Sequence, residues 1–336
     1  MLARKSAVLF AASAVALSLL SGLPGPVAVA QPEPAVSHLD HIDRPGQRQQ
    51  VFYVYSAAMD RIIPLQILTA FDQSEPRPTL YLLNGAGGGE DLASWYNQTD
   101  IVQFLGEKNV NVVTPSVGAF SYYTDWQRDD PKLGRNKWET FLTRELPPII
   151  DAQLGASGVN AIAGVSMSAT SVLYMAGAAP DLYRAVGSFS GCASTLDSAG
   201  RTYIDLVLAR AGASPKNMWG ENGDPAWRDH DAVLNAERLR GKAIYLSSAT
   251  GLPGEAEQIL PPYSVGQVMT KANQMVLGGL IEAATNTCTH QLADRLAELG
   301  IPAQLEYRAA GSHTWHYWEQ DLHKSWPMFA AALGIS

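Results

Sequence analysis

The stretch Gly164-Val165-Ser166-Met167-Ser168 constrains the fold of this 336-residue chain more than any other. It follows a short apolar run, Val159 to Ala163, that is typical of a buried strand. The Ala-rich segment Ala169 to Ala179 comes next and predicts a helix. A strand, a sharp turn carrying a serine and a helix form a nucleophile elbow, which lifts the serine hydroxyl clear of the backbone. Ser168 stands where the G-x-S-x-G pattern has its second glycine. Since an ordinary turn serine gives a similar stretch, the rest of the chain has to decide.

Short apolar runs between turn signals predict the other strands. Two of them, 50–56 and 62–71, alternate in part and predict an antiparallel pair at a sheet edge. The remaining predicted strands, typical of a parallel sheet, are 79–83, 110–114, 159–163, 185–189, 243–247 and 303–307. Helical patterns occur at 137–154, at 265–299 with a break at Gly278-Gly279, and at 317–333 with an interruption near Pro327, while 201–240 predicts an excursion from the sheet. We therefore expect an α/β-hydrolase fold with a mostly parallel central sheet, helices on both faces and a single catalytic domain over 49–336.

The first thirty residues have the features of a cleaved secretion signal. Arg4 and Lys5 precede an apolar run from Ala7 to Leu20, and Ala28-Val29-Ala30 is an A-x-A cleavage signal. A retained membrane anchor is the alternative, but the Gly and Pro residues at 22–26 leave the apolar run too short to span a bilayer well. We expect a secreted protein, cleaved after Ala30, with an extended lead-in over 31–48.

Composition excludes several classes of function. A hydrophobic fraction of 46% and a charged fraction of 17% sustain a large core, and the net charge of −8 argues against nucleic acid as a partner. In an exported chain the pair Cys192 and Cys288 predicts a disulfide, with two buried free thiols as the alternative. The cysteines and scattered histidines lack metal-ligand spacing, so we expect neither a metal nor a cofactor.

A glycine-rich loop, Gly85 to Gly89, follows the predicted strand 79–83. In α/β-hydrolases a loop at this place supplies one backbone donor of the oxyanion hole, and the residue after the nucleophile supplies the other. We therefore expect the amides of Ala86 and Met167 to face the substrate carbonyl. A phosphate cradle is the rival interpretation, but no G-K-[ST] follows and the acidic pair Glu90-Asp91 would repel the anion.

The order of residues in the chain indicates a base for Ser166. In this fold the histidine lies on the loop after the last strand, where His313 follows the predicted strand 303–307. The acid that orients the histidine is less well defined. Glu255 and Glu257 come after the strand before last, and Glu282 has apolar neighbours further on. Spacing alone does not choose among the three.

Several separated stretches are similar to one known family. They are LYLLNG (Leu80–Gly85), YTDW (Tyr123–Trp126), KWETFLTRELP (Lys137–Pro147), GVSMS (Gly164–Ser168), MWG (Met218–Gly220), DPAW (Asp224–Trp227) and GSHTWHYW (Gly311–Trp318). In this order they resemble the motifs of the antigen 85 mycolyltransferase family, a group of cell-envelope acyltransferases. The similarity runs from about Thr79 to Trp318.

The resemblance implies an acid and a reaction. The family's catalytic glutamate falls on Leu280-Ile281-Glu282-Ala283, so by analogy Glu282 is the acid, Ser166 the nucleophile and His313 the base. The family moves a mycolyl chain between trehalose molecules or onto arabinogalactan, which implies a ping-pong mechanism. Trehalose mycolates and cell-wall glycan acceptors are then the expected partners, at the cell envelope, with the chain as a monomer. The expected substrate-side residues are Asn84, Gly87, Asp125, Trp126, Trp315 and Trp318.

The chain departs from the family pattern at several positions. Gly87 stands where the family often has an arginine that contacts trehalose, and Asn84 replaces an aspartate. A cysteine found near the acid in some members has no counterpart. Cys192 and Cys288 instead fall near the active site, and we expect them to bridge and to place the loop that carries Glu282.

Two other functions are compatible with the sequence. The first is a secreted serine esterase that hydrolyses lipid or sugar esters with water, which the missing arginine favours. The second is a surface binding protein of the fibronectin-binding type with a vestigial triad. A complete set of Ser166, Glu282 and His313 argues against an inactive protein.

Overall fold

The computed structural model describes residues 35–258, 261–262 and 264–335. The predicted signal segment and the first residues of the lead-in lie outside these residues. From Val36 onward the chain clusters into one unit built around a single sheet. The strands are β1 (His38–Asp43), β2 (Gln49–Ser56), β3 (Arg61–Leu68), β4 (Thr79–Leu83), β5 (Asn111–Pro115), β6 (Asn160–Val165), β7 (Tyr183–Phe189), β8 (Ala243–Ala249) and β9 (Gln304–Arg308).

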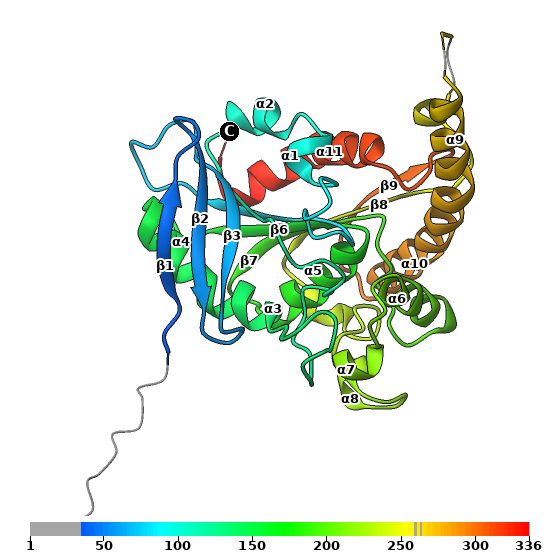
Figure 1. Cartoon of the computed structure of the whole chain (residues 1–336), viewed down its shortest axis with the longest axis horizontal. Helices are drawn as coiled ribbons and strands as arrows, with labels where there is room; N and C mark the ends of the chain where they lie inside the picture. The colour runs from blue at the N-terminus through cyan, green and yellow to red at the C-terminus, as the bar shows by residue number, and fades with distance from the viewer. Residues whose placement is uncertain (1–34, 259–260, 263, 336) are drawn as a thin grey trace, which may run out of the picture. The chain divides into compact units, whose positions relative to one another are not determined.

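The described strands form a nine-stranded sheet in the order β1-β2-β3-β5-β4-β6-β7-β8-β9. From β5 to β9 all neighbours pair in parallel, while β1, β2 and β3 form an antiparallel ladder that joins β5 (Figure 1). Strands β4, β5 and β6 are buried at every position, because helices cover both of their faces. The mostly parallel sheet and the antiparallel pair β2–β3 predicted from the sequence are confirmed.

Strand β1 lies inside the stretch that was expected to be an extended lead-in. It pairs with β2 through the register His38↔Tyr55 to Asp43↔Val51 and forms the outer edge of the sheet. Most of its side chains are exposed, so its sequence HLDHID lacks the apolar alternation that marks a buried strand. The predicted pair β2–β3 is therefore one strand removed from the edge.

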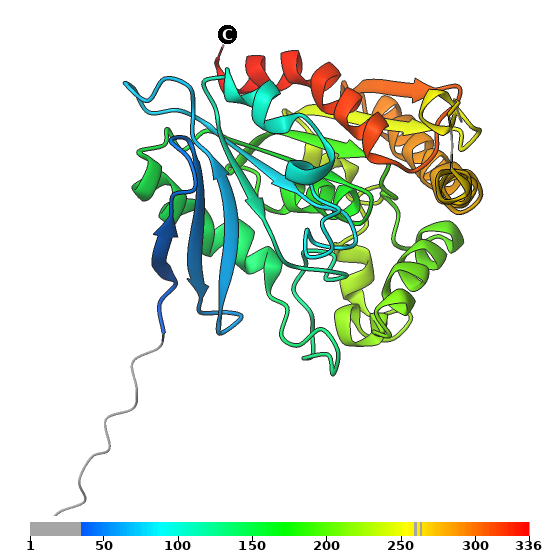
Figure 2. The ribbon, with the colours of Figure 1, turned by 45° about the horizontal axis from the view of Figure 1, so that its top comes forward.

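Helices cover the sheet on both faces (Figure 2). They are α1 (Trp95–Gln98), α2 (Ile101–Gly106), α3 (Trp138–Thr140), α4 (Leu146–Leu154), α5 (Met167–Ala178), α6 (Ser198–Arg210), α7 (Pro215–Trp219), α8 (Pro225–Asp229), α9 (Val265–Asn273), α10 (Gly279–Glu298) and α11 (Trp315–Leu333). Side chains of α1, α2 and α11 share one apolar cluster on one face, and those of α4, α5 and α10 share the other cluster. The fold is the α/β-hydrolase fold that the sequence predicted, with α6, α7 and α8 as the excursion between β7 and β8.

Two helical details differ from expectation. Helix α11 runs without interruption through Pro327, because Trp326, Met328 and Phe329 are buried on either side of it and hold both halves against the sheet. The expected break at Gly278-Gly279 is a π-helical turn, η4 (Gln274–Gly278), that joins α9 to α10 without ending the helix. No helix in the described ranges is both long and apolar enough to span a membrane.

Candidate active site

Ser166 lies in a strained turn between β6 and α5. Its backbone adopts φ 55° and ψ −120°, a conformation that a non-glycine residue rarely holds unless its surroundings enforce it. The turn is tight because two glycines allow close approach. A Cβ on Gly164 would come within 2.5 Å of Ser168 Oγ, and one on Gly191 within 2.5 Å of Ala169 Cβ. This is the geometry of a nucleophile elbow.

Ser168 replaces the second glycine of the elbow pattern and has a structural role. Its hydroxyl accepts a hydrogen bond from the Val165 amide at 3.0 Å and lies 3.2 Å from the Leu83 carbonyl oxygen. The side chain is fully buried, so it fits between β6, β4 and α5. A serine therefore preserves the close packing of strand and helix, and its hydroxyl ties them together.

His313 and Glu282 complete a hydrogen-bonded chain with Ser166. His313 Nε2 is 2.7 Å from Ser166 Oγ, and His313 Nδ1 is 2.7 Å from Glu282 Oε2. Only 9% of the His313 side chain and 2% of the Glu282 side chain is exposed, so little water competes for these bonds. His313 lies on the loop after β9, where its amide donates to the Gly278 carbonyl at 3.2 Å. The three residues have the arrangement of nucleophile, base and orienting acid.

The second oxygen of Glu282 is held by groups that sequence reasoning did not identify. Glu282 Oε1 accepts hydrogen bonds from Ser190 Oγ at 2.8 Å and from the Ala249 amide at 2.7 Å. Ser190 in turn accepts a bond from Trp318 Nε1 at 3.0 Å, and its own φ is 55°. Ser166 follows β6, and Ser190 follows the neighbouring parallel strand β7. Both hydroxyls therefore lie at the carboxyl ends of these strands, in one site.

The other two acids considered from the sequence lie elsewhere. Glu255 is exposed and pairs with His316 Nε2 at 3.0 Å. Glu257 is buried beneath the His313 loop and accepts bonds from the Gly254 amide at 2.7 Å, the Tyr317 hydroxyl at 2.8 Å and the Ser312 hydroxyl. Burial alone would raise the pKa of Glu257, but these hydrogen bonds outweigh it and hold the pKa below its usual value. Of the three candidates, the structure brings Glu282 alone to His313.

The expected oxyanion donors flank Ser166. Met167 is the first residue of α5, so its amide has no acceptor within the helix. A Cβ on Gly85 would lie 3.6 Å from Ser166 Cβ, which places the glycine-rich loop against Ser166. In that loop the Ala86 carbonyl accepts from the Phe120 amide at 2.7 Å, and within the described residues the Ala86 amide donates to no protein group. Both amides are therefore available to a substrate oxygen.

The expected substrate-side residues divide into two groups. Asn84 and Trp126 are buried, and their polar groups bond the Pro115 and Ser121 carbonyls, while both Asp125 oxygens bond Thr140. We propose that these three shape the surrounding loops without touching substrate. Trp318 packs edge-on against His313 with ring centroids 4.8 Å apart, and the partly exposed Trp315 packs against Trp318 at 5.1 Å.

Gly87 lies beside a carboxylate. A Cβ at this position would come within 2.3 Å of both Asp91 carboxylate oxygens. The space next to Gly87 therefore holds a negative group, where the resemblance leads one to expect an arginine.

Tyr203 of α6 is a further neighbour of Ser166. Its hydroxyl lies 3.1 Å from Ser166 Oγ, and the residue is 5% exposed. The ring also lines a groove of about 380 Å³ between α6 and the start of α10, with mainly apolar walls that include Leu206, Leu277 and Leu280. The sequence offered no signal for Tyr203, because it lies in the excursion from the sheet.

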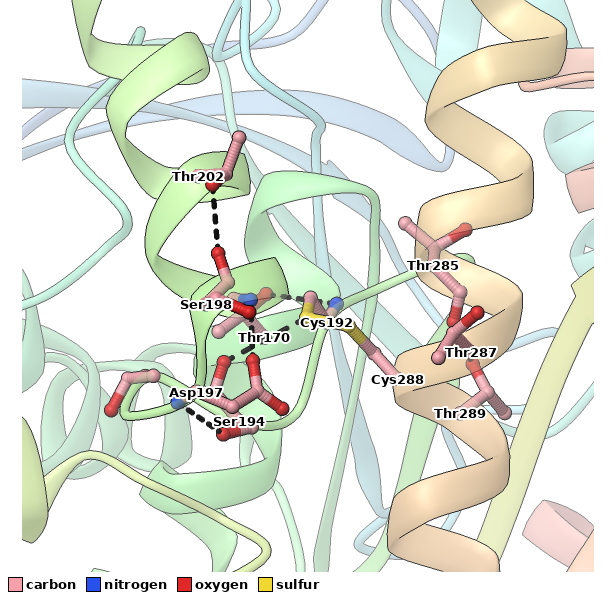
Figure 3. Close-up of a disulfide and its surroundings, with 12 residues drawn as sticks. Thr170, Cys192, Ser194, Asp197, Ser198, Thr202, Thr285, Thr287, Cys288 and Thr289 are labelled. Atoms are coloured by element: carbon pink, nitrogen blue, oxygen red, sulfur yellow. Dashed lines mark hydrogen bonds between the residues drawn. A yellow bond between two sulfur atoms is a disulfide. The ribbon is translucent and has the colours of Figure 1, made fainter.

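The disulfide between Cys192 and Cys288 is confirmed (Figure 3). It joins the segment after β7 to α10 with Cα atoms 4.9 Å apart. Cys192 is two residues beyond Ser190, and Cys288 is six residues beyond Glu282 on the same helix. The expectation of a loop carrying Glu282 is wrong, because Glu282 lies in the first turn of α10. Its side chain is buried there, so the chain stays helical although Gly278-Gly279 predicts a break. The disulfide thus ties the segment that carries Ser190 to the helix that carries Glu282.

In the part of the chain that the structure describes, no group of three or more His, Cys, Asp or Glu side chains is placed to hold a metal ion.

Comparison with known proteins gives a consistent result. A family model described as a putative esterase matches residues 56–329. The chain is 29% identical over 335 residues to diacylglycerol acyltransferase/mycolyltransferase Ag85B of Mycobacterium avium, covering 97% of this chain and 93% of the relative. It is 30% identical over 340 residues to diacylglycerol acyltransferase/mycolyltransferase Ag85A of Mycobacterium leprae, covering 96% and 93%.

Solved structures show the same fold. MPT51 (FbpC1) of Mycobacterium tuberculosis aligns with a TM-score of 0.70 at 22% identity, over 86% of this chain and 100% of that one. The fluorophosphonate-binding serine hydrolase FphF of Staphylococcus aureus aligns with a TM-score of 0.61 at 17% identity, over 83% and 97%.

Proposed function

The chain belongs to the putative esterase family and, within it, to the antigen 85 group, and from that premise we propose that it is an acyltransferase with Ser166 as nucleophile. We propose as its donor a mycolyl ester of trehalose, and as its acceptor trehalose or a cell-wall glycan at the cell envelope. The observation that carries the proposal is the hydrogen-bonded chain from Glu282 through His313 to Ser166 at the nucleophile elbow.

The proposed reaction has two halves. In the first, His313 Nε2 takes the Ser166 proton as Oγ attacks the ester carbonyl, and the amides of Ala86 and Met167 bind the developing oxyanion. The C–O bond to the sugar breaks, and His313 returns the proton to the departing sugar hydroxyl. In the second, His313 removes a proton from an acceptor hydroxyl, whose oxygen attacks the acyl carbon. The bond from that carbon to Oγ breaks, and His313 returns the proton to Ser166. Glu282 holds the His313 tautomer throughout.

The apolar groove beside Tyr203 supports an acyl substrate. A long alkyl chain bound there would lie against Leu206, Leu277 and Leu280, which are otherwise exposed by 61%, 56% and 68%. Such extensive apolar exposure next to a reactive serine is more useful to a lipid ester than to a soluble one.

Hydrolysis by water is the second candidate, and one observation favours it. The Asp91 carboxylate beside Gly87 takes the place in which the resemblance leads one to expect a cation that contacts trehalose. A sugar acceptor loses one charge-assisted contact there, whereas water needs none.

Product analysis separates the two. Mature protein is incubated with trehalose monomycolate, the products are identified by mass spectrometry, and Ser166→Ala is the control. Acyl transfer predicts trehalose dimycolate and free trehalose, both absent with the control. Free mycolic acid as the sole acyl product would replace the transferase with the esterase, and equal turnover by the control would refute both.

A further inference from the structure

The hydroxyl of Tyr203 is a second partner of the nucleophile. Ser166 Oγ lies 2.7 Å from His313 Nε2 and 3.1 Å from Tyr203 Oη. Both partners are largely shielded from solvent, and Tyr203 makes no other side-chain hydrogen bond within the described residues. Tyr203 lies on α6, a helix that carries none of the three triad residues.

The direction of each hydrogen bond follows from the triad. His313 Nδ1 donates to the Glu282 carboxylate, so Nε2 of the neutral ring is an acceptor. Ser166 therefore donates its proton to Nε2, and its oxygen accepts from Tyr203. Burial raises the pKa of Tyr203, which keeps the donating proton in place.

Acylation removes this acceptor. When Ser166 Oγ becomes the alkoxy oxygen of an ester, its lone pair is delocalised into the carbonyl group and accepts a hydrogen bond poorly. The Tyr203 bond is thus present in the free enzyme and weakened in the acyl-enzyme.

We propose that Tyr203 is a further catalytic residue that favours release of the acyl group from Ser166, an inference that rests on the proposed acyl-enzyme mechanism. In the release step the acceptor hydroxyl gives its proton to His313, and its oxygen bonds the acyl carbon. The bond from that carbon to Oγ then breaks, and Oγ takes the proton back from His313. Oγ simultaneously regains the hydrogen bond from Tyr203, which lowers the free energy of the products.

Tyr203→Phe removes the hydroxyl and keeps the ring. The ring continues to line the groove with Leu206 and Leu280, so substrate access is kept while the bond to Oγ is lost. Both half-reactions pass through the same kind of tetrahedral species at Oγ, so effects on the free energies of the two transition states cancel in the ratio of acyl-enzyme to free enzyme. That ratio therefore reports the ground-state effect of the hydrogen bond.

The experiment measures that ratio with p-nitrophenyl butyrate at one sub-saturating concentration, by acid quench and intact-protein mass spectrometry. The matched control is Tyr183→Phe, which removes a buried hydroxyl bonded to the Leu142 carbonyl, outside the site. Loss of one neutral hydrogen bond predicts a ratio about fivefold higher in Tyr203→Phe than in wild type or the control. Melting temperature is recorded for each variant.

Three results count against specific claims. A ratio in Tyr203→Phe equal to or below that of wild type, with turnover intact, overturns the role of Tyr203 and leaves the proposed function standing. A Tyr203→Phe ratio that rises no more than in Tyr183→Phe does the same. An adduct that persists in Ser166→Ala overturns the proposed mechanism and this inference together.

Discussion

Ser166 and Ser190 hold the same unusual backbone angle, φ 55°, at the ends of adjacent strands. Each conformation costs of order 1–3 kcal/mol, and it persists because the surrounding packing enforces it. The result is that one hydroxyl reaches His313 and the other reaches Glu282. The strain is therefore localised on the two serines that contact His313 and Glu282.

Glu282→Gln tests the acid. An amide can accept from His313 only after the carboxylate's bonds to Ser190 and Ala249 are rearranged, and it cannot stabilise an imidazolium by charge. We expect kcat with an ester substrate to fall by about 10⁴-fold, as for comparable substitutions in serine triads. Steady-state kinetics provide the measurement, with Glu255→Gln as an exposed control. A fall of less than tenfold would remove Glu282 from the triad.

Ser168→Ala tests the elbow's departure from the usual pattern. The substitution leaves the buried Val165 amide without its acceptor, so the free energy of unfolding should fall by about 1–3 kcal/mol. The hydrogen bonds from Ser166 to His313 and from His313 to Glu282 are untouched, and kcat should stay within about twofold. Ser168→Gly restores the usual glycine and should be no more stable than the alanine variant. Urea denaturation checks this, and a glycine variant more stable than wild type would contradict it.

Site residues could be predicted from the sequence where the elements next to them in the chain mark their role. Ser166 is marked by the strand, turn and helix around it, and His313 by its place after the last strand. Glu282 needed the resemblance to a family, because three glutamates fit the spacing. Ser190 and Tyr203 gave no signal, since their contacts with Glu282 and Ser166 span 92 and 37 positions of sequence.

At the level of elements, Glu257 connects the turn at Gly254 with three other segments near His313. It accepts hydrogen bonds from Gly254, from Ser312 on the His313 loop and from Tyr317 on α11. Gln274 of η4 also donates to it at 3.1 Å. This carboxylate therefore fixes the loop that presents His313 to Ser166.

Glu257→Gln should change the pH dependence of stability. Because the folded-state pKa lies below the unfolded value of 4.5, the carboxylate stabilises the fold fully above that pH. The stabilisation is lost as pH falls through the lower folded-state pKa. We expect the variant to melt at a lower temperature than wild type at pH 7, and the difference to shrink below pH 4.5.

Thermal melts from pH 3 to pH 7, roughly the range over which carboxylates titrate, measure the effect. Glu255→Gln is the control, because that side chain is exposed and its pairing with His316 is weakened by solvent screening. A Glu257→Gln curve parallel to wild type across the whole range would show that Glu257 does not stabilise the fold as a carboxylate.

Elements were predicted well where burial sets their pattern. Strands β4 and β6 are apolar and interior, and their positions agree with the sequence within two residues. Strand β1 was missed because an exposed edge strand needs no apolar face. The continuity of α11 through Pro327 was missed because proline's local preference is overridden by the packing of Trp326 and Phe329.

At the scale of the whole molecule, the parallel sheet explains why the site lies where it does. Ser166 follows β6, Ser190 follows β7, Ala249 ends β8 and His313 follows β9. Since parallel strands share one carboxyl edge, these groups meet there although they are far apart in sequence.

The disulfide acts at the same scale, because it spans 96 positions and encloses α6, α7, α8, β8 and α9. Closing a loop of this size stabilises a fold by up to about 4–5 kcal/mol through the unfolded chain. The double variant Cys192→Ala/Cys288→Ala should lose stability on that order and also lose activity, because α10 carries Glu282. Denaturation and ester turnover measure the two effects, and an unchanged melting temperature on reduction of the wild-type protein would contradict the first.

In the proposed mechanism, Ser166 carries the acyl group between donor and acceptor. Its most direct test is to react the mature protein with trehalose monomycolate, quench with acid and map the acyl adduct by peptide mass spectrometry. We expect a mycolyl ester on Ser166 that disappears when trehalose is added in excess, and that is absent in Ser166→Ala and His313→Ala. An adduct on another residue, or none while dimycolate accumulates, would contradict it.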